Sequence, residues 1–234
     1  MQNKLTEKNP QQTPPHPILY SFRRCPFAMR GRMGLYAAGL NPEVREITLR
    51  DKPPHMLEIS PKGTVPVLWL EDGSVIDESL DVMLYALNQK DPNNWLKNKK
   101  EALELISEND SSFKQALDRY KYPNRYEDED GFGETNWRAE GEKFLQKLEA
   151  RLEVNLFLFG HAPELADHAI FPFIRQFRMP DPEWFDGTNK VAAPYPQVKR
   201  WLNTLIESDI FQAIMPKLKP WEAGDAPLFL QNLK

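Results

Sequence analysis

The chain has almost no cysteine and no long apolar segment. Its 234 residues include one cysteine, Cys25, so a disulfide can form only with a thiol from outside the chain. No stretch approaches the roughly 18 consecutive apolar residues of a membrane span, and residues 1–17 lack the apolar core of a signal peptide. These absences exclude an internal disulfide framework and predict a cytoplasmic protein with no membrane partner.

An excess of positive charge is missing as well. The chain has 30 Lys and Arg against 34 Asp and Glu, a formal net charge of −4. The basic residues are spread among the acidic ones rather than gathered in a stripe, so nucleic acid is not an expected partner. The histidines do not have the spacing of metal ligands, and we predict no metal site. With 41 % hydrophobic and 11 % aromatic residues, the chain can build one or two packed cores.

The first part of the chain alternates between strand and helix patterns. Apolar runs bounded by turn residues predict strands over 18–22, 44–49, 64–70 and 75–76. Helical spacing predicts helices from about Pro26 to Gly39, over 55–59 and over 79–87. The polar stretch 91–94 that follows is typical of a domain linker.

Beyond this linker, apolar residues recur at helical spacing and no convincing strand is present. Helices are predicted over 165–177, 196–207 and 210–218, with prolines between them. The loop 121–133 carries the acidic run 127–130 and is expected to be solvated. We therefore expect a mobile lead-in over 1–16, an α/β domain over 17–90 and an all-helical domain over 95–234.

Cys25 lies between the first predicted strand and the first predicted helix. The unpaired N–H groups at a helix start favour a thiolate. The arginines at 23, 24 and 30 add positive charge nearby. A buried, inert side chain is the commoner fate of a lone cysteine, but the Cys25-Pro26 turn favours a reactive nucleophile.

The order of strand, Cys-Pro turn, helix, strand, helix, Val-Pro hairpin and helix resembles that of a thioredoxin-like domain. From Pro17 to about Lys219 the chain resembles the cytosolic glutathione transferases, and the run 25–28, Cys-Pro-Phe-Ala, is most similar to the cysteine-bearing omega class and its bacterial relatives. The resemblance implies a thioredoxin-like α/β domain followed by an all-helical domain, with glutathione as cosubstrate. It also implies that Cys25 is catalytic and forms a mixed disulfide with glutathione.

The same resemblance assigns residues to a glutathione site. Val65 pairs with the cysteinyl backbone of glutathione beside a cis-Pro66. Glu78 accepts from the γ-glutamyl ammonium, and Ser79 at a helix start donates to the adjacent carboxylate. A structural reading stands beside each role: an edge-strand start at 65–66, a surface acid at 78 and a helix cap at 79.

Two further residues are assigned in the same way. Lys52 faces the glycyl carboxylate of glutathione, and the ring of Phe27 forms a wall of its binding slot. An exposed lysine and a core phenylalanine are the simpler readings of these two positions.

The second domain carries fewer chemical signals. Asp167 resembles the family's helix-start aspartate, which binds backbone N–H groups and serves folding. Glu164 stands where serine or threonine is usual, so half of the capping box is expected to be missing. His168 is expected to be a satisfied core residue. Tyr120, Trp137 and Phe173 are candidates for the second substrate pocket, although helix packing explains each of them as well.

The predicted function is glutathione-dependent thiol transfer, in which Cys25 acts on a glutathione mixed disulfide or on an oxidised acceptor of the dehydroascorbate type. The partners are then glutathione and a small electrophile or disulfide, and the resemblance implies a homodimer. Two alternatives stay open. One is a conjugating transferase in which Cys25 only orients glutathione, and the other is a non-enzymatic interaction scaffold on the same fold.

Overall fold

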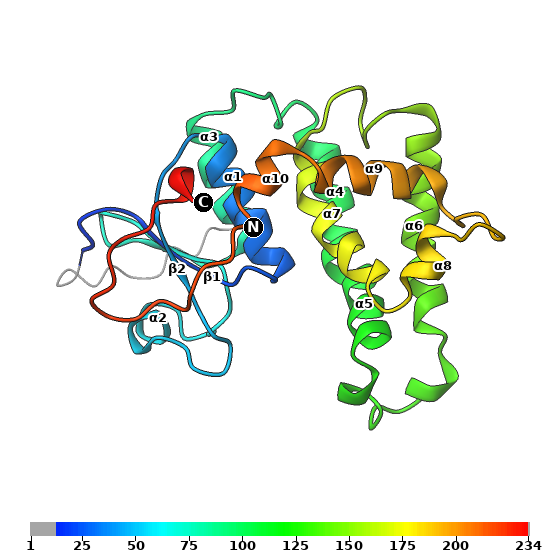
Figure 1. Ribbon diagram of the computed structural model, residues 1–234, viewed down its shortest axis with the longest axis horizontal. Coiled ribbons are helices and arrows are strands. Elements are labelled where there is room, and N and C mark those ends of the chain that lie inside the picture. The colour runs from blue at the N-terminus through cyan, green and yellow to red at the C-terminus, as the bar shows by residue number, and fades with distance from the viewer. Residues whose placement is uncertain (1–12, 234) are drawn as a thin grey trace. The chain divides into compact units, whose positions relative to one another are not determined.

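A computed structural model describes residues 13–233 (Figure 1). They form two compact units: one holds the described residues up to Asn93 and those from Asp209 onward, and the other holds Asn94–Ser208. Of the expected mobile lead-in, residues 1–16, positions 1–12 lie outside the described residues. His16, which is described, bonds through Nε2 to a carboxylate oxygen of Glu43 at 2.8 Å.

The first unit contains a four-stranded sheet in the order β2-β1-β3-β4. Its strands are β1 (Ile18–Ser21), β2 (Glu43–Glu46), β3 (Val67–Trp69) and β4 (Val75–Ile76). β1 runs parallel to β2 and antiparallel to β3, and β3 runs antiparallel to β4. All four residues of β1 are buried, as expected for a central strand covered on both faces. The four expected strands are present, and those expected over 44–49 and 64–70 are shorter than predicted.

Three helices complete the α/β pattern: α1 (Pro26–Ala37), α2 (Pro54–Ile59) and α3 (Ser79–Gln89). Proline suits the first turn of α1 because its missing N–H would have no helical partner there. Gly39 follows the helix with a φ of 72°, a conformation that favours glycine. α1 and α3 approach so closely that a Cβ on Gly34 would lie 2.7 Å from the Cα of Met83. This unit has the thioredoxin-like arrangement predicted from the sequence.

The second unit is helical, as predicted. Its helices are α4 (Lys99–Glu108), α5 (Lys114–Lys121), α6 (Trp137–Val154), α7 (Leu165–Arg178), α8 (Pro182–Asp186) and α9 (Pro196–Ile206). A π-helical turn, Asn109–Phe113, joins α4 to α5. The central helix is α7, which is buried along most of its length and carries Phe171, Phe173 and Phe177 into the core. The acidic run 127–130 is exposed, as expected.

The start of α7 corrects one expectation. Glu164 and Asp167 form a reciprocal capping box, so no half of it is missing. The carboxylate of Asp167 accepts from the backbone N–H groups of Leu158 and Glu164, each at 2.9 Å, and from Nε1 of Trp201 at 2.7 Å. Glutamate replaces serine or threonine at the N-cap because its carboxylate offers the same acceptor on a longer side chain. The predicted contacts of Asp167 with backbone N–H groups are confirmed, and its role in folding stays a prediction.

The end of the chain differs from the predicted domain boundary. The helix expected over 210–218 is the shorter α10 (Asp209–Ala213). The residues after it run along β2, where the N–H of Trp221 bonds to the Glu46 carbonyl at 2.8 Å and the N–H of Val44 bonds to the Leu228 carbonyl at 2.7 Å. These backbone bonds place 209–233 with the sheet, whereas the sequence assigned the whole of 95–234 to the helical domain. Because Pro216 and Pro220 break helical hydrogen bonding, the segment is extended and its N–H groups are available to β2.

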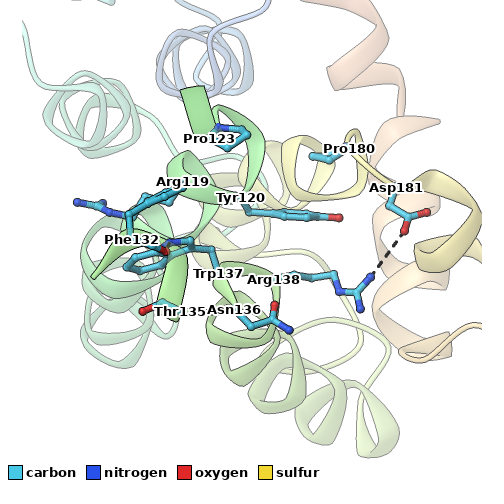
Figure 2. A pocket seen from close by; sticks show the side chains of 10 residues that line it. All are labelled: Arg119, Tyr120, Pro123, Phe132, Thr135, Asn136, Trp137, Arg138, Pro180 and Asp181. Atoms are coloured by element: carbon cyan, nitrogen blue, oxygen red, sulfur yellow. Dashed lines mark hydrogen bonds and ion pairs between the residues drawn. The ribbon is translucent and has the colours of Figure 1, made fainter. Parts of the chain in front are cut away.

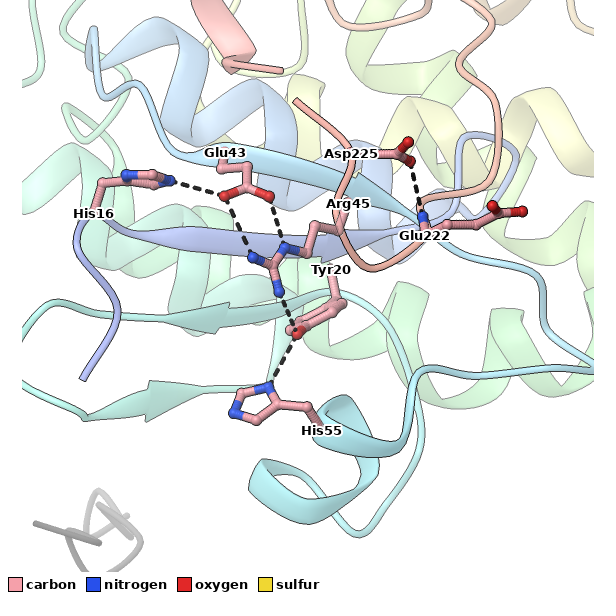
Figure 3. Close-up of polar contacts among 7 residues, drawn as sticks. All are labelled: His16, Tyr20, Glu43, Arg45, His55, Glu222 and Asp225. Atoms are coloured by element: carbon pink, nitrogen blue, oxygen red, sulfur yellow. Dashed lines mark hydrogen bonds and ion pairs between the residues drawn. The ribbon is translucent and has the colours of Figure 1, made fainter. Parts of the chain in front are cut away.

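A row of polar side chains crosses the sheet beside this segment (Figure 3). Arg45 donates through Nε to Glu43 at 2.7 Å and through Nη1 to the Tyr20 hydroxyl at 3.0 Å. The Tyr20 hydroxyl also lies 3.0 Å from Nδ1 of His55. The guanidinium of Arg45 sits 4.2 Å from the ring centroid of Trp221, which attaches the C-terminal segment to the sheet.

None of the helices within residues 13–233 combines the length and the apolar character that crossing a bilayer takes.

Candidate active site at the start of α1

Cys25 is the N-cap residue of α1, and its side chain makes no capping hydrogen bond. Its backbone N–H donates to the Phe22 carbonyl at 3.0 Å, which closes the turn between β1 and the helix. The Cys25 side chain is half-buried and forms no disulfide, and its Sγ lies 3.8 Å from the Val65 carbonyl oxygen. The sulfur therefore stands at the positive end of the helix dipole without being enclosed in the core.

The turn before Cys25 is held by two buried charged residues. The N–H of Arg23 donates to Oε1 of Glu46 at 2.8 Å, and its carbonyl accepts from Nη2 of Arg32 at 2.8 Å. Burial lowers the pKa of Arg32 to about 10, although the charges of Glu46 and Cys25 oppose this shift. Burial also raises the pKa of Glu46, against the effect of the Arg23 N–H and of Arg32. Sequence reasoning missed both residues.

Val65 and Pro66 lie directly opposite this turn. The peptide bond between them is cis, which confirms the expected conformation. The ring of Pro66 packs against α1, since a Cβ on Gly31 would lie 3.1 Å from its Cγ. The structure thus brings the backbone of Val65 next to the thiol of Cys25.

The start of α3 carries Glu78 as the N-cap and Ser79 as the first helical residue. The fully buried Arg30 donates through Nη1 to Oγ of Ser79 at 3.2 Å. Lys62 bonds to Oε1 of Glu78 at 2.6 Å and lies 3.1 Å from Oδ1 of Asp77. Burial alone would lower the pKa of Lys62, but the hydrogen bonds to these two carboxylates raise it above its usual value. The sequence did not indicate this ion pair between Lys62 and Glu78.

Phe27 and Lys52 are the two remaining residues predicted for the site. Phe27 is half-buried, and the guanidinium of Arg30 is 5.6 Å from its ring centroid. Lys52 is half-buried beside Gly63, where an added Cβ would meet its Nζ at 3.4 Å. Arg30 therefore contacts both Phe27 and Ser79. Lys52 lies beside Gly63, two residues before Val65.

Two of the three candidates for a second substrate pocket line a cavity within the helical unit, and their role in substrate binding stays a prediction (Figure 2). Tyr120 and Trp137 border a space of about 490 Å³. Trp137 is oriented by a bond from its Nε1 to the Phe132 carbonyl at 3.2 Å. Across the opening, Nη1 of Arg138 is 3.6 Å from Oδ2 of Asp181. Phe173 is fully buried in the core instead, so the packing explanation is the right one for that residue.

No three His, Cys, Asp or Glu side chains within residues 13–233 are grouped so as to hold a metal ion. The buried His168 stacks on Trp95 at a centroid distance of 3.6 Å and an interplanar angle of 15°. Burial lowers the pKa of His168 to about 3, so its ring is neutral at physiological pH. Neither ring nitrogen has a hydrogen-bond partner in the described part of the chain, in contrast to the satisfied core histidine that was expected.

Comparison with known proteins decides what this arrangement is. A family model for the N-terminal domain of glutathione S-transferases matches residues 19–95, and a model for their C-terminal domain matches residues 106–204. The chain belongs to the glutathione S-transferase family. It is accordingly a glutathione transferase, an enzyme with glutathione as its cosubstrate and with omega-class proteins among its relatives.

Three relatives show how far this likeness extends. The transferase is 28 % identical to glutathione S-transferase omega-1 of Mus musculus over 208 residues, which cover 84 % of this chain and 82 % of the relative. A solved glutathione transferase family member from Pseudomonas fluorescens pf-5 matches with a TM-score of 0.70 and 20 % identity, over 87 % of this chain and 93 % of that one. Glutathione transferase Omega 2C from Trametes versicolor matches with a TM-score of 0.66 and 20 % identity, over 86 % of this chain and 93 % of that one.

Proposed function

We propose that this glutathione transferase is a cysteine-type thiol transferase with Cys25 as its nucleophile. The observation that carries the proposal is the position of Cys25: an uncapped helix start, a half-exposed sulfur and a neighbouring Val65 carbonyl 3.8 Å away. Tyrosine or serine at this place could activate glutathione but could not form a disulfide with it. The omega-1 name of the Mus musculus relative supports the same class of chemistry.

The reaction is a pair of thiol–disulfide exchanges. The Cys25 thiolate attacks the glutathionyl sulfur of a mixed disulfide, the S–S bond breaks, and the acceptor leaves as a thiolate that takes up a proton. The thiolate of a second glutathione then attacks the Cys25–glutathione disulfide. This step releases glutathione disulfide and regenerates the Cys25 thiolate, so atoms and electrons balance with glutathione as the reductant.

Glutathione binds in this proposal along the segment that faces Cys25. The backbone of Val65, before Pro66, pairs with the cysteinyl part of the tripeptide. Ser79 donates to the γ-glutamyl carboxylate, and its oxygen already accepts from Arg30, which leaves the hydroxyl hydrogen for the ligand. Glu78 accepts from the γ-glutamyl ammonium.

The other end of the tripeptide completes the slot. Lys52 bonds to the glycyl carboxylate, and the ring of Phe27 forms one wall. The Pseudomonas fluorescens relative was solved with two glutathione molecules bound, which supports a glutathione site in this fold.

Intact mass measurement after exposure to glutathione disulfide tests the proposal. The expected result is a gain of one glutathionyl group that reduced glutathione removes. The variant Cys25→Ala should show no adduct and no glutathione-dependent reduction of a mixed disulfide. An unmodified wild-type protein, or a variant that keeps its reductase activity, would overturn the mechanism. Activity of Cys25→Ala with an aromatic halide would favour conjugation instead.

We further propose that the enzyme works as a homodimer in the cytoplasm on a small disulfide or electrophile. The single cysteine and the glutathione chemistry both suit a reducing compartment. Sedimentation equilibrium of the full chain tests the assembly, and a monomer at micromolar concentration would contradict it.

A further inference from the structure

Arg32 is a buried cation two helical turns beyond Cys25. Only 2 % of its surface is exposed. Its Nη1 donates to Oγ of Ser21 at 2.9 Å, and its Nη2 donates to the Arg23 carbonyl at 2.8 Å and approaches Sδ of Met215 at 3.7 Å. Its Nε has no hydrogen-bond partner in the described part of the chain. Burial of a guanidinium costs free energy, which the charges around it and its donated hydrogen bonds offset.

Glu46 lies on the other side of the same turn, at the end of β2. It is 8 % exposed, and its Oε1 accepts from the Arg23 N–H at 2.8 Å. Arg23 is therefore held at both of its peptide groups, by a carboxylate at the N–H and by a guanidinium at the carbonyl. Because Arg23 stands two residues before Cys25, this clamp fixes the path of the chain into the nucleophile.

The two charges also act on the sulfur. The Cys25 charge is among the influences that raise the pKa of Arg32, so the two groups interact through space. Coulomb interactions are mutual, and the Arg32 cation therefore favours the Cys25 thiolate. Glu46 offsets part of that positive charge. The other charged groups facing this pair are Arg23 and Arg24, both cations.

We propose that Arg32 and Glu46 are positioning residues for Cys25, which clamp the turn before it and balance the charge that its thiolate meets. Arg32 promotes the thiolate and Glu46 restrains it. The inference rests on the proposed function for the identity of the nucleophile alone. It adds two residues that set the reactivity of that nucleophile.

The test measures alkylation of Cys25 by iodoacetamide as a function of pH, followed by intact mass, and uses no glutathione. Below the midpoint of the profile, Arg32→Met should react about threefold more slowly than wild type, because the thiolate loses its buried cation. Glu46→Gln should react about threefold faster, because the amide still accepts from Arg23 but no longer offsets Arg32. Arg32→Lys should restore most of the wild-type rate.

The opposite signs separate a charge role from a structural one, since loosening the turn would move both variants in the same direction. Glu71→Gln, at an exposed site between β3 and β4, is the matched control and should match wild type. Shifts of the same sign, or none, would overturn the inference. If Arg32→Met does not fold, Glu46→Gln and Arg32→Lys still decide the outcome. The variants could show these opposite changes in alkylation rate while the wild-type protein forms no adduct with glutathione disulfide. That result would overturn the proposed function and leave this inference standing.

Discussion

The two units each place a chemically important residue at a helix start, and they do so in opposite ways. At α7 the carboxylate of Asp167 is fully buried and accepts from three N–H donors. At α1 the thiol of Cys25 is half-exposed and caps nothing. The start of α7 is closed by a reciprocal capping box, whereas the start of α1 has no side-chain cap.

The capped start of α7 serves the stability of the fold, and the uncapped start of α1 serves the reactivity of Cys25. A capped helix start holds the fold together, and its polar group cannot take part in chemistry because each acceptor is already used. An uncapped start gives up about 1 kcal/mol of capping energy and keeps a positive potential for an incoming anion or thiolate. The start of α3 lies between these extremes, since Ser79 accepts a hydrogen bond from Arg30 while Glu78 bonds to the ammonium of the exposed Lys62.

Asp167→Ala should produce the largest change. Three buried donors would lose their acceptor, which should lower the free energy of unfolding by about 4 kcal/mol. Asp167→Asn should recover part of this loss, because one oxygen can still accept from Leu158 and Trp201. Urea denaturation measures both variants. Cys25→Ala is the contrasting control and should change stability by less than about 1 kcal/mol. Equal losses of stability at both helix starts would show that the two starts do not differ in this way.

The neighbouring His168 should make the second unit sensitive to acid. Burial lowers its pKa from 6.5 to about 3 in the folded protein. Its contribution to stability is therefore present above about pH 6.5 and is lost as the pH falls toward 3. At pH 4.5 the loss should be about 2.5 kcal/mol relative to pH 7.

Urea denaturation of His168→Phe at the two pH values checks this, because phenylalanine keeps the stacking on Trp95 and cannot take up a proton. The variant should lose about 2.5 kcal/mol less stability than wild type on acidification. His161→Phe, at an exposed position, serves as the control. An unchanged pH dependence in His168→Phe would contradict the prediction.

A cap introduced at α1 should trade reactivity for stability. In Cys25→Ser the hydroxyl can accept from an N–H of the first helical turn, which should raise the free energy of unfolding by about 1 kcal/mol over Cys25→Ala. Both variants should fail to form a glutathione adduct. Thermal unfolding and intact mass measure the two effects. Equal melting temperatures would mean that the uncapped start costs the fold nothing.

Removal of Lys62 should have the smallest effect, at the intermediate helix start. In Lys62→Met, Glu78 loses its internal ammonium, so the γ-glutamyl ammonium of glutathione should bind about threefold more tightly. Isothermal titration calorimetry measures the affinity, with Lys90→Met, at the exposed end of α3, as the control. Weaker binding would show instead that Lys62 contacts glutathione itself.

Much of the fold followed from local patterns. Apolar runs bounded by turn residues predicted all four strands, and helical spacing predicted α1, α3, α7 and α9 to within a few residues. The Cys25-Pro26 and Val65-Pro66 pairs led to the two segments that meet at the site. The catalytic role of Cys25 is a proposal, as are the glutathione-binding roles of Phe27, Lys52, Val65, Pro66, Glu78 and Ser79.

Other features left no local trace. Glu164 did not look like a cap because the usual residues there are shorter, yet its carboxylate completes the box with Asp167. Sequence reasoning did not single out Arg32, which is almost fully buried. A signal was present in its neighbours Met29 and Met33, both buried on the same helix, but spacing alone does not show where a charge finds its partner.

The amino-acid sequence was enough to show which residue can form a disulfide and in what order the strands and helices follow, and it led to the proposed chemistry of the site. These depend on residue identity and on short-range periodicity, which the chain carries along its length. Three contacts could be seen only in the folded chain. Arg32 and Glu46 both bond to the backbone of Arg23, Lys62 bonds to the carboxylate of Glu78, and the last segment bonds to β2. Each of these joins residues distant in sequence, and the stability of a buried charge or an unpaired strand edge depends on what folding brings beside it.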